Sequence, residues 1–505
     1  KKPGKIHELS RELSNLAIKG SLGIGHTRWA THGVPNELNA HPHLDGGGKI
    51  AVVHNGIIEN YQEIKRDLIN KGFLFKSQTD TEVIVHLIDS HFETCNKDIK
   101  KATKKALEEL NGTFAIAVIA ESAPDQIFVA RKGSPLVIGV GKDENFISSD
   151  INTILSHTKE VIYLQDNQVA TLTRESVVIE TLDGEVVVPE IKTMKWDPIA
   201  AEKSGYDHYM LKEIYEQPSV ARTIISKYVN ADHTINFKEL NRGNIDLKKV
   251  NRIIIQACGT SWHAGLVAKY MIEDYARVLT EVDISSEFRY RQMLMQDNDI
   301  VMAISQSGET ADTLACIREA KSKFFNVLSF VNVKESTIDR ESDGVIYTYA
   351  GQEVGVASTK NYLAQLICLY LFSIHLGEIK GRVSAEKRKE LIEALNRLPG
   401  YVEQILKQAD HIKSIAEKYR LSREFLFIGR QLNYPSALEG ALKLKEISYI
   451  HATGYAAGEL KHGPIALIDS KLPVVCVAPE SATHDKMLSN IEEVKSRKGK
   501  IISIA

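Results

Sequence analysis

The N-terminal part of the chain, up to about residue 195, alternates between short apolar runs and amphipathic segments. Apolar positions spaced three and four apart predict helices over 60–70 and 81–92. Continuous apolar runs predict strands over 49–54 and 112–120. Shorter strands are predicted at 127–129, 135–140, 169–173, 177–180 and 185–188, with a hairpin turn at Asp183-Gly184. The pattern therefore predicts an α+β domain built from antiparallel hairpins.

A different pattern, strand, small-residue turn and helix, begins near residue 251 and predicts parallel α/β layers. A polar helical connector is expected to precede it, through residues 208–213. The pattern repeats, since 252–256 matches 424–428, 299–304 matches 472–477, and 317–323 matches 491–497. Three matches at an offset of 172 to 174 residues indicate two copies of one domain, with a helical spacer over about 384–419. The first copy continues to a strand at 344–349, whereas the second ends at 500–505, so we expect the second to be shorter by one strand.

Composition and charge exclude several classes of partner. The 505 residues carry 63 Lys and Arg against 65 Asp and Glu, which gives no electrostatic case for nucleic acid or an anionic membrane. The longest apolar run, 362–376, contains Gln365, Ser373 and His375 and is expected to be a buried helix, not a membrane span. Five scattered cysteines without a CxxC pair argue against a structural zinc site and favour a reducing, cytoplasmic location.

Hydroxyl side chains gather at three predicted strand-to-helix turns. The turn 305–310 reads Ser-Gln-Ser-Gly-Glu-Thr, and backbone N–H groups at such a helix start suit a phosphate monoester. The alternative is an ordinary capping turn in which Ser307 caps the helix. Thr260-Ser261 and Ser358-Thr359 occupy similar turns of the same sheet. Because ligands bind at the carboxyl ends of such strands, three hydroxyl-rich turns together favour a phosphosugar pocket.

A charged helix face in the second copy offers proton-transfer groups. Glu439, Lys443 and Glu446 are spaced to share one helix face. A solvated salt-bridge face is the default interpretation of this spacing. The helix is nevertheless rich in Ala, Leu and Gly, and it precedes the segment 458–464 with His462. A carboxylate and a histidine near a phosphosugar are what proton transfer beside a carbonyl requires.

Three N-terminal stretches, 26–33, 54–56 and 79–82, supply an amino-acid clamp. An Arg, an Asp and hydroxyls can hold the carboxylate and ammonium ends of an amino acid, and an Asn beside a Gly N–H can form an oxyanion hole. Histidines in this region also raise the possibility of zinc. No Cys or carboxylate spacing supports a metal, so loop packing is the favoured interpretation of His26, His32, His41, His43 and His54.

Nearly the whole chain resembles the glutamine–fructose-6-phosphate aminotransferase (isomerising), or glucosamine-6-phosphate synthase, family. The resemblance is carried by the stretches 26–33, 39–43, 54–56, 79–82, 208–218, 305–310, 356–360 and 443–464. It implies an N-terminal-nucleophile α+β (αββα) glutaminase domain followed by two α/β sugar-isomerase (SIS) domains with parallel sheets. The expected division is a glutaminase domain over 1–195, a linker over 196–247, SIS domains over 248–380 and 419–505, and a helical spacer over 381–418.

The resemblance also implies roles for individual residues. Those expected to bind glutamine are Arg28, Thr31, His32, Gly56 and Asp80, with Asn55 and Gly56 at the oxyanion hole and Trp29 gating an ammonia channel. Those expected to hold the sugar phosphate are Thr260, Ser261, Ser305, Gln306, Ser307, Thr310 and Ser358. Glu446 would move the proton between C1 and C2, Lys443 would lie near the reacting carbons, and His462 would open the sugar ring from the partner subunit.

The implied reaction joins two chemistries without a nucleotide, flavin or metal cofactor. Glutamine is hydrolysed through a Cys thioester, ammonia passes through the protein, and fructose 6-phosphate becomes glucosamine 6-phosphate, the first step towards UDP-N-acetylglucosamine. A homodimer with a shared isomerase site is expected.

Two departures from the family pattern concern its reactive residues. The family's nucleophilic Cys follows the initiator Met, whereas residue 1 is Lys and the first cysteine is Cys95, at a predicted helix end. The family's Schiff-base Lys would lie beyond residue 505, so we expect a fragment without either group and without glutaminase activity. A non-catalytic phosphosugar-binding SIS regulator is the alternative function. A phosphoribosyl-type amidotransferase, which has no pair of SIS copies, is set aside.

Overall fold

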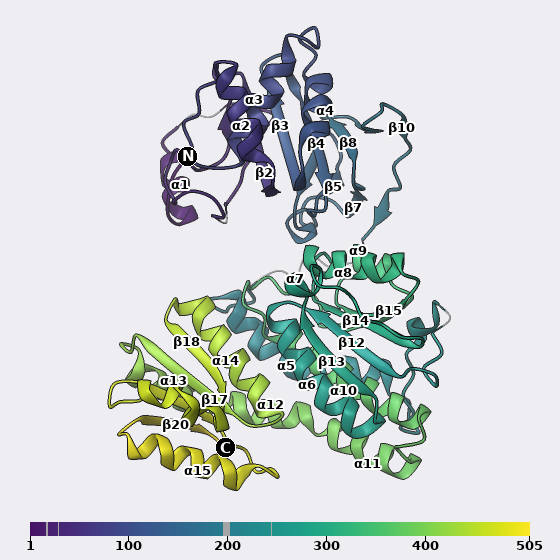
Figure 1. Cartoon of the computed structure of the whole chain (residues 1–505), viewed down its shortest axis with the longest axis vertical. Helices are drawn as coiled ribbons and strands as arrows, with labels where there is room; N and C mark the ends of the chain where they lie inside the picture. The colour runs from purple at the N-terminus through teal and green to yellow at the C-terminus, as the bar shows by residue number, and fades with distance from the viewer. Residues whose placement is uncertain (17–18, 29, 195–202, 244) are drawn as a thin grey trace. The chain divides into compact units, whose positions relative to one another are not determined.

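The computed structural model describes residues 1–16, 19–28, 30–194, 203–243 and 245–505 (Figure 1). The chain divides into two compact units, Lys1–Ala200 and Ala201–Ala505, and each is described by itself. Trp29, the expected channel gate, lies outside the described residues. The predicted boundaries of the linker, the two SIS domains and the spacer stay predictions, because the division between the two compact units lies near residue 200.

The first unit is built on two antiparallel sheets. Its longest pairing joins β2 (Ile50–Ile58) to β3 (Gly112–Ala120) along their whole length. The seven-stranded sheet has the order β1-β2-β3-β4-β8-β9-β10, and the other members are β1 (His43–Leu44), β4 (Ala123–Lys132), β8 (Gln168–Leu172), β9 (Val177–Thr181) and β10 (Val186–Val187). The four-stranded sheet has the order β11-β7-β5-β6, comprising β11 (Lys192–Thr193), β7 (Glu160–Tyr163), β5 (Val137–Val140) and β6 (Asn145–Ser148).

Helices cover one face of the seven-stranded sheet, and the smaller sheet covers the other. The period-two alternation of β2 sends Val52 into the core formed with the helices, while Val53 packs against residues of the smaller sheet. The covering helices are α2 (Tyr61–Asn70), α3 (Thr81–Phe92) and α4 (Ile99–Glu109), while α1 (Ile6–Leu13) has no buried residue. A short turn, η1 (Ile151–Thr153), lies against the outer face of the smaller sheet. The α+β prediction with antiparallel hairpins is confirmed.

The second unit contains two parallel sheets with the same strand order. The first is β13-β12-β14-β15-β16, comprising β12 (Arg252–Ala257), β13 (Leu279–Ile284), β14 (Asp299–Ser305), β15 (Asn326–Val331) and β16 (Gly344–Tyr347). The second is β18-β17-β19-β20, comprising β17 (Glu424–Gly429), β18 (His451–Ala456), β19 (Pro473–Val477) and β20 (Lys500–Ile504). Each strand matched by sequence occupies the same position in its sheet, as a duplicated domain requires.

Helices lie on both faces of the first parallel sheet. Ile253 and Ile255 of β12 pack with α5, α6 and α10, whereas Ile254 packs with α7 and α8. The helices of this copy are α5 (Tyr209–Tyr228), α6 (Gly259–Ala276), α7 (Ser285–Phe288), α8 (Ala311–Ser322), α9 (Thr337–Glu341) and α10 (Lys360–Ile379). The spacer and second copy contribute α11 (Ala385–Asn396), α12 (Leu398–Leu406), α13 (Ala409–Tyr419), α14 (Asn433–Ser448), η4 (Ala457–His462), η5 (Pro464–Leu467) and α15 (His484–Ser496).

The helices α10 and α5 pack into the same core of the second unit. Among the described residues, α10 is the one helix long and apolar enough to cross a membrane, yet its Leu369 and Phe372 are fully buried against α5 and α6. The expectation of a buried helix is therefore confirmed. The helix expected through 208–213 is confirmed as the start of α5, which continues to Tyr228 because its apolar side packs into the same core. Cys95 lies in the turn after α3, not within the helix.

Phe372→Ala is expected to destabilise the second unit by about 3–5 kcal/mol, because it removes a fully buried ring that contacts Phe330 at 5.7 Å between ring centroids. The measurement is the urea unfolding midpoint. The matched control is Phe324→Ala, whose ring is 96% exposed, and its effect should stay within about 0.5 kcal/mol. Equal shifts for the two variants would contradict this assignment of the core.

Candidate functional site

Arg28 organises the loop that follows His26. Its guanidinium donates to the carbonyl oxygens of His32 at 2.5 Å and Gly33 at 3.0 Å. Its backbone has a φ of 45°, in the left-handed region that few residues other than glycine adopt. Asn39 then connects the loop to the next predicted stretch, since its Nδ2 donates to Val34 O at 2.9 Å and its Oδ1 accepts from Gln78 N at 2.8 Å. The loop after His26 is thus tied to the residue that immediately precedes the stretch 79–82.

Asp80 faces this loop from the start of α3. Its Oδ2 accepts a hydrogen bond from the backbone N–H of Ile58 at 2.9 Å, and its Oδ1 lies 3.8 Å from His32 Nδ1. Thr31 Oγ1 lies 3.2 Å from the same histidine nitrogen. The carboxylate of Asp80 is buried. The carboxylate of Asp80, the imidazole of His32 and the hydroxyl of Thr31 therefore lie close together. These are groups that an amino acid's charged ends would require.

Asn55 and Gly56 lie in the middle of β2, next to a cavity. Gly56 has a φ of 127°, and a Cβ there would lie 2.0 Å from the carbonyl oxygen of Thr113, so only glycine fits. Asn55 Oδ1 lies 2.6 Å from His26 Nε2. Asn55 and His26 line a cavity of about 580 Å³. Cys95 is buried in the helix-side core and does not line it.

Two further histidines of this unit, His43 and His54, each lie within hydrogen-bond distance of a threonine hydroxyl. His43 Nε2 lies 3.1 Å from Thr79 Oγ1, and His54 Nδ1 lies 3.0 Å from Thr81 Oγ1. Burial is the main cause that lowers their pKa values, to about 4 for His43 and His54 and to about 2 for His41. Within the described part of the chain, no three His, Cys, Asp or Glu side chains are grouped so that they could hold a metal ion.

In the second unit, the turn 305–310 is tightly folded at the carboxyl end of β14. Ser305 Oγ accepts from Gly308 N at 3.0 Å and lies 2.9 Å from Thr310 Oγ1. Gly308 has a φ of 67°, and a Cβ there would overlap Ser336. Ser307 does not cap α8, because Thr310 is the N-cap residue and makes no side-chain capping bond. The capping interpretation is therefore wrong, and the first N–H groups of α8 have no side-chain cap.

The second hydroxyl turn lies beside the first, because β12 and β14 are neighbours in the sheet. Ser261 Oγ accepts from Gln365 Nε2 at 2.9 Å, which joins the first turn of α6 to α10. Thr260 Oγ1 donates to Glu439 Oε1 at 2.9 Å. Residue 439 belongs to α14 of the second copy, so the hydroxyl turn of one copy contacts a helix of the other.

The third turn, which carries Ser358, is held by two carboxylates. Glu213 Oε1 of α5 accepts from the backbone N–H groups of Val354 at 2.6 Å and Gly355 at 3.1 Å. Glu353 Oε1 accepts from Thr359 N at 2.8 Å. Burial raises the pKa of Glu213 despite these hydrogen bonds. The loop leads directly into α10, whose Gln365 contacts the second hydroxyl turn.

Glu439 and Lys443 of α14 complete this cluster. Lys443 Nζ lies 2.5 Å from Glu446 Oε2, 3.3 Å from Glu439 Oε1 and 3.1 Å from Thr260 Oγ1. Glu439 is only 6% exposed, and its Oε2 lies 2.6 Å from Nδ1 of His263. A solvated salt-bridge face is therefore the wrong interpretation for Glu439. Its spacing was visible in the sequence, whereas nothing local indicated His263.

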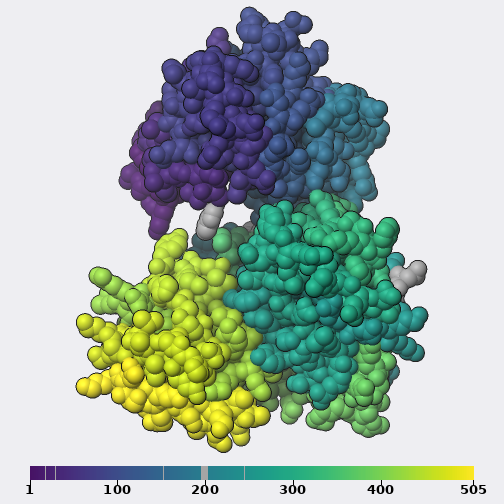
Figure 2. Space-filling view, viewed as in Figure 1, coloured from purple at the N-terminus to yellow at the C-terminus, as the bar shows by residue number. Residues whose placement is uncertain are grey.

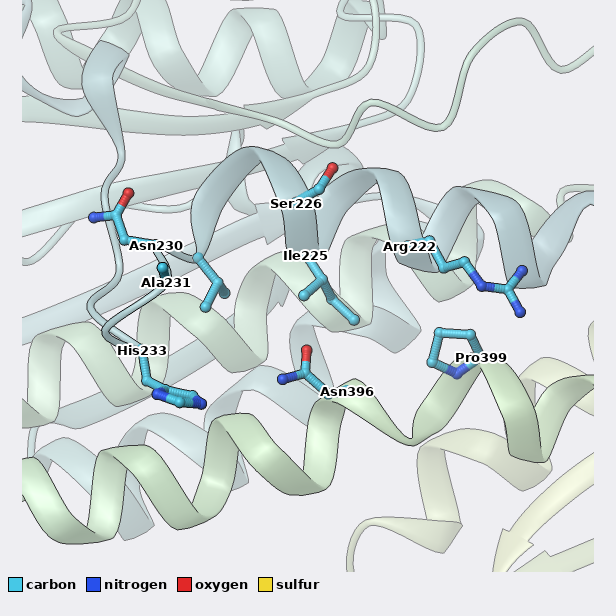
Figure 3. Close-up of a pocket in the computed structure, with 9 residues that line it drawn as sticks. Arg222, Ile225, Ser226, Asn230, Ala231, His233, Asn396 and Pro399 are labelled. Carbon is cyan, nitrogen blue, oxygen red and sulfur yellow. The ribbon is translucent and has the colours of Figure 1, made fainter.

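His462 lies at the end of η4 and is exposed. In the ranges that the structure describes, no hydrogen bond or ion pair joins it to the hydroxyl turns. Two further pockets, one of about 340 Å³ and one of about 560 Å³, are lined by none of the expected site residues. One pocket of about 340 Å³ lies between the end of α5 and the α11–α12 junction, with Asn230, His233 and Asn396 on its lining (Figure 3). Arg222, at one end of this pocket, pairs with Glu403.

Comparisons with known proteins identify both units. A glutamine amidotransferase domain model matches residues 26–156, and a SIS domain model matches residues 246–375 and 418–505. The glutamine–fructose-6-phosphate aminotransferase (isomerizing) of Aquifex aeolicus is 50% identical over 504 residues, covering 100% of this chain and 82% of the relative. The enzyme of the same name from Methanosarcina mazei is 48% identical over 511 residues, covering 99% and 82%.

The chain belongs to the glutamine–fructose-6-phosphate aminotransferase family. A solved structure agrees with this membership in the second unit. The C-terminal domain of glucosamine–fructose-6-phosphate aminotransferase from Francisella tularensis has a TM-score of 0.58 and 45% identity. It covers 60% of this chain and 85% of its own. This chain therefore combines a glutamine amidotransferase domain with two SIS domains.

We expect the first unit to lose stability as pH falls from 7 to 4. The unfolded chain takes up protons on histidine near pH 6.5, whereas His43 and His54 stay neutral until about pH 4. Each ring therefore lowers the free energy of unfolding by up to roughly 1.4 kcal/mol for each pH unit of decrease within that window. The measurement is the thermal midpoint as a function of pH. His43→Gln should flatten the slope, because it removes one of the two rings that stay neutral in the folded unit. A parallel slope for His43→Gln would contradict the assignment.

Proposed function

We propose that the chain transfers the amide nitrogen of glutamine to fructose 6-phosphate, with isomerisation to glucosamine 6-phosphate. The observation that supports this function most strongly is that one chain of this family contains two candidate sites, one in each unit. In the first unit, Arg28 bonds to the carbonyl oxygen of His32, and the ring of the same His32 lies 3.8 Å from Asp80, which supports a clamp for an amino acid. The second joins hydroxyl turns of one SIS copy to an acid–base helix of the other.

In the first site we assign Arg28, Thr31 and His32 to the α-carboxylate of glutamine and Asp80 to its ammonium group. Charge-assisted hydrogen bonds of this kind fix orientation as well as affinity. The side-chain N–H of Asn55 and the backbone N–H of Gly56 would stabilise the oxyanion that forms when the amide carbon is attacked. Glutamine hydrolysis in this family proceeds at a cysteine thiolate, and we assign no such role to Cys95, because it lies outside the cavity.

In the second site we assign the turn 305–310 and the N-terminus of α8 to the sugar phosphate. Ser305, Gln306, Ser307 and Thr310 supply polar groups in that turn, and Thr260, Ser261 and Ser358 supply the adjoining hydroxyls. Their three turns follow strands of the same sheet, so the phosphate and the reacting carbons can be held at one edge. Parallel strands deliver every such turn to this edge, which is why distant segments converge.

The proton chemistry is assigned to α14. After ammonia adds at C2 and water leaves, a base must remove the C1 proton and return a proton to C2, which converts a ketose to an amino aldose. Glu446 is the proposed base, and its carboxylate is held by Lys443 at 2.5 Å. The side chain of Glu446 is 34% exposed, so a substrate has access to it. We also propose that His462 of the partner subunit opens the sugar ring in a homodimer.

A phosphosugar-binding regulator without catalysis is the second candidate. It would bind sugar phosphates through the SIS copies and would not consume glutamine. The amidotransferase match over 26–156 and the clamp around Asp80 favour the enzyme. A gating role for Trp29 and a cytoplasmic location remain predictions.

Glu446→Gln is expected to lower glucosamine 6-phosphate formation at least about 100-fold with either glutamine or ammonia as nitrogen donor, because it removes the proposed base. Product is measured by chromatography after mixing with fructose 6-phosphate. The matched control is Glu492→Gln in α15, which disrupts a similar helical pair with Lys495 and should keep normal turnover. Near-normal product formation by Glu446→Gln would remove this residue from its role.

In the full-length enzyme, Arg28→Gln is expected to raise the glutamine KM at least about tenfold while leaving the ammonia-dependent reaction unchanged, because the clamp and the sugar site are built from different units. Steady-state rates with each nitrogen donor give the comparison. Arg66→Gln, on the exposed side of α2, is the control and should change neither reaction. Equal loss of both reactions would show that the two sites do not divide the labour.

A further inference from the structure

His26 stands between a backbone amide and the proposed oxyanion residue. The backbone N–H of Arg28 donates to its Nδ1 at 2.9 Å, and its Nε2 lies 2.6 Å from Oδ1 of Asn55. A backbone N–H can only donate, so Nδ1 must be the unprotonated nitrogen. The ring is therefore the neutral Nε2–H tautomer, which donates to Asn55.

The tautomer in turn fixes which way the amide of Asn55 faces. A flipped amide would point its NH₂ group at Nε2, and that nitrogen would then have to accept. The proton would move to Nδ1, where it would face the N–H of Arg28, donor against donor. The flip is thus opposed by a main-chain group two residues from His26. With Oδ1 occupied by the ring, the NH₂ group of Asn55 is left for other partners, beside a cavity that both side chains line.

The surroundings of His26 favour a neutral and stationary ring. Burial is the main cause that lowers its pKa, and the positive charge of Arg28 acts in the same direction. His41 stacks on the ring with centroids 4.1 Å apart. The Nδ1 of His41 accepts from the backbone N–H of His54 at 3.4 Å, so the stacking partner is itself tied to β2. A neutral Nε2–H donor is what the bond to Asn55 requires.

We propose that His26 is a positioning residue of the glutamine reaction, which holds the side-chain N–H of Asn55 towards the oxyanion formed at the amide carbon. The inference rests on the proposed function of the first unit. The chain of dependence runs from the main-chain N–H of Arg28 to the tautomer of His26, and from the tautomer to the orientation of Asn55. The residue therefore acts on the transition state without contacting glutamine, and its loss should lower kcat more than it changes KM.

His26→Phe keeps the ring and its stacking but removes both nitrogens. Since removal of an oxyanion donor itself costs about 10²–10³ in kcat, losing its orientation should lower the glutamine-dependent kcat of the full-length enzyme about 10–100-fold. The glutamine KM and the ammonia-dependent rate should stay within about threefold. His26→Gln can place one acceptor and one donor in the same two directions and should restore part of kcat. His41→Phe, which alters the stack but not the bond to Asn55, should keep kcat within about threefold.

A spectroscopic measurement tests the tautomer independently of activity. In the native protein with ¹⁵N-labelled histidine, long-range proton–nitrogen spectra should show His26 with Nδ1 unprotonated and Nε2 protonated at pH 7, assigned by loss of the signal in His26→Gln. An Nδ1–H tautomer or an imidazolium would overturn the proposal. This test uses the native protein, so it holds even if the His26→Phe variant does not fold. A raised KM with unchanged kcat in His26→Phe would do the same, as would an equal loss of kcat in His41→Phe.

Measurements on the full-length enzyme separate failure of the positioning role from failure of the proposed function. A full-length enzyme that consumes no glutamine, while its His26 shows the Nε2–H tautomer, would refute the proposed function and with it the positioning role of His26. A native enzyme that consumes glutamine, with kcat unchanged in His26→Phe, would refute the positioning role alone.

Discussion

The buried carboxylate of Glu439 is the interaction on which the second site depends. It is 6% exposed and lies within hydrogen-bond reach of Thr260 and His263, both from the other SIS copy, with Lys443 at 3.3 Å. A buried carboxylate is costly unless it is paired, and breaking such a network costs about 3–5 kcal/mol. The same contact that holds α14 against α6 also orients Lys443 towards Glu446. Figure 2 shows the surfaces of the two copies, green and yellow, side by side in this unit.

Duplication of the domain explains why this contact can create a site. Each copy brings its turns to the carboxyl edge of its own sheet, and neither contains all the groups for amination and proton transfer. The first copy supplies hydroxyls at 260–261 and 305–310, and the second supplies α14 with the ion pair of Lys443 and Glu446, to which we assign the proton chemistry. The first unit achieves its clamp differently, through loops braced by Arg28 and by the amide of Asn39.

The sequence predicted well whatever depends on local pattern. Apolar runs and apolar spacing predicted the strand at 112–120 and the helix at 81–92, and matching segments revealed the internal repeat. The composition of the turn 305–310 indicated its place between a strand and a helix. What could not be predicted depends on pairs distant along the chain. The contact of Thr260 with Glu439 joins residues 179 apart, and a charged helix face looks solvated until its partner is known. Cavity access and the tautomer of a ring are likewise set only by three-dimensional neighbours.

The central claim is that one sugar phosphate is bound jointly by the two SIS copies, and a crystal structure of the enzyme with fructose 6-phosphate tests it most directly. The account predicts phosphate oxygens within hydrogen-bond distance of the 305–310 turn. It also predicts C1 and C2 beside Lys443 and Glu446 of α14. A sugar phosphate that contacts only one copy, or whose phosphate lies away from that turn, would contradict the account.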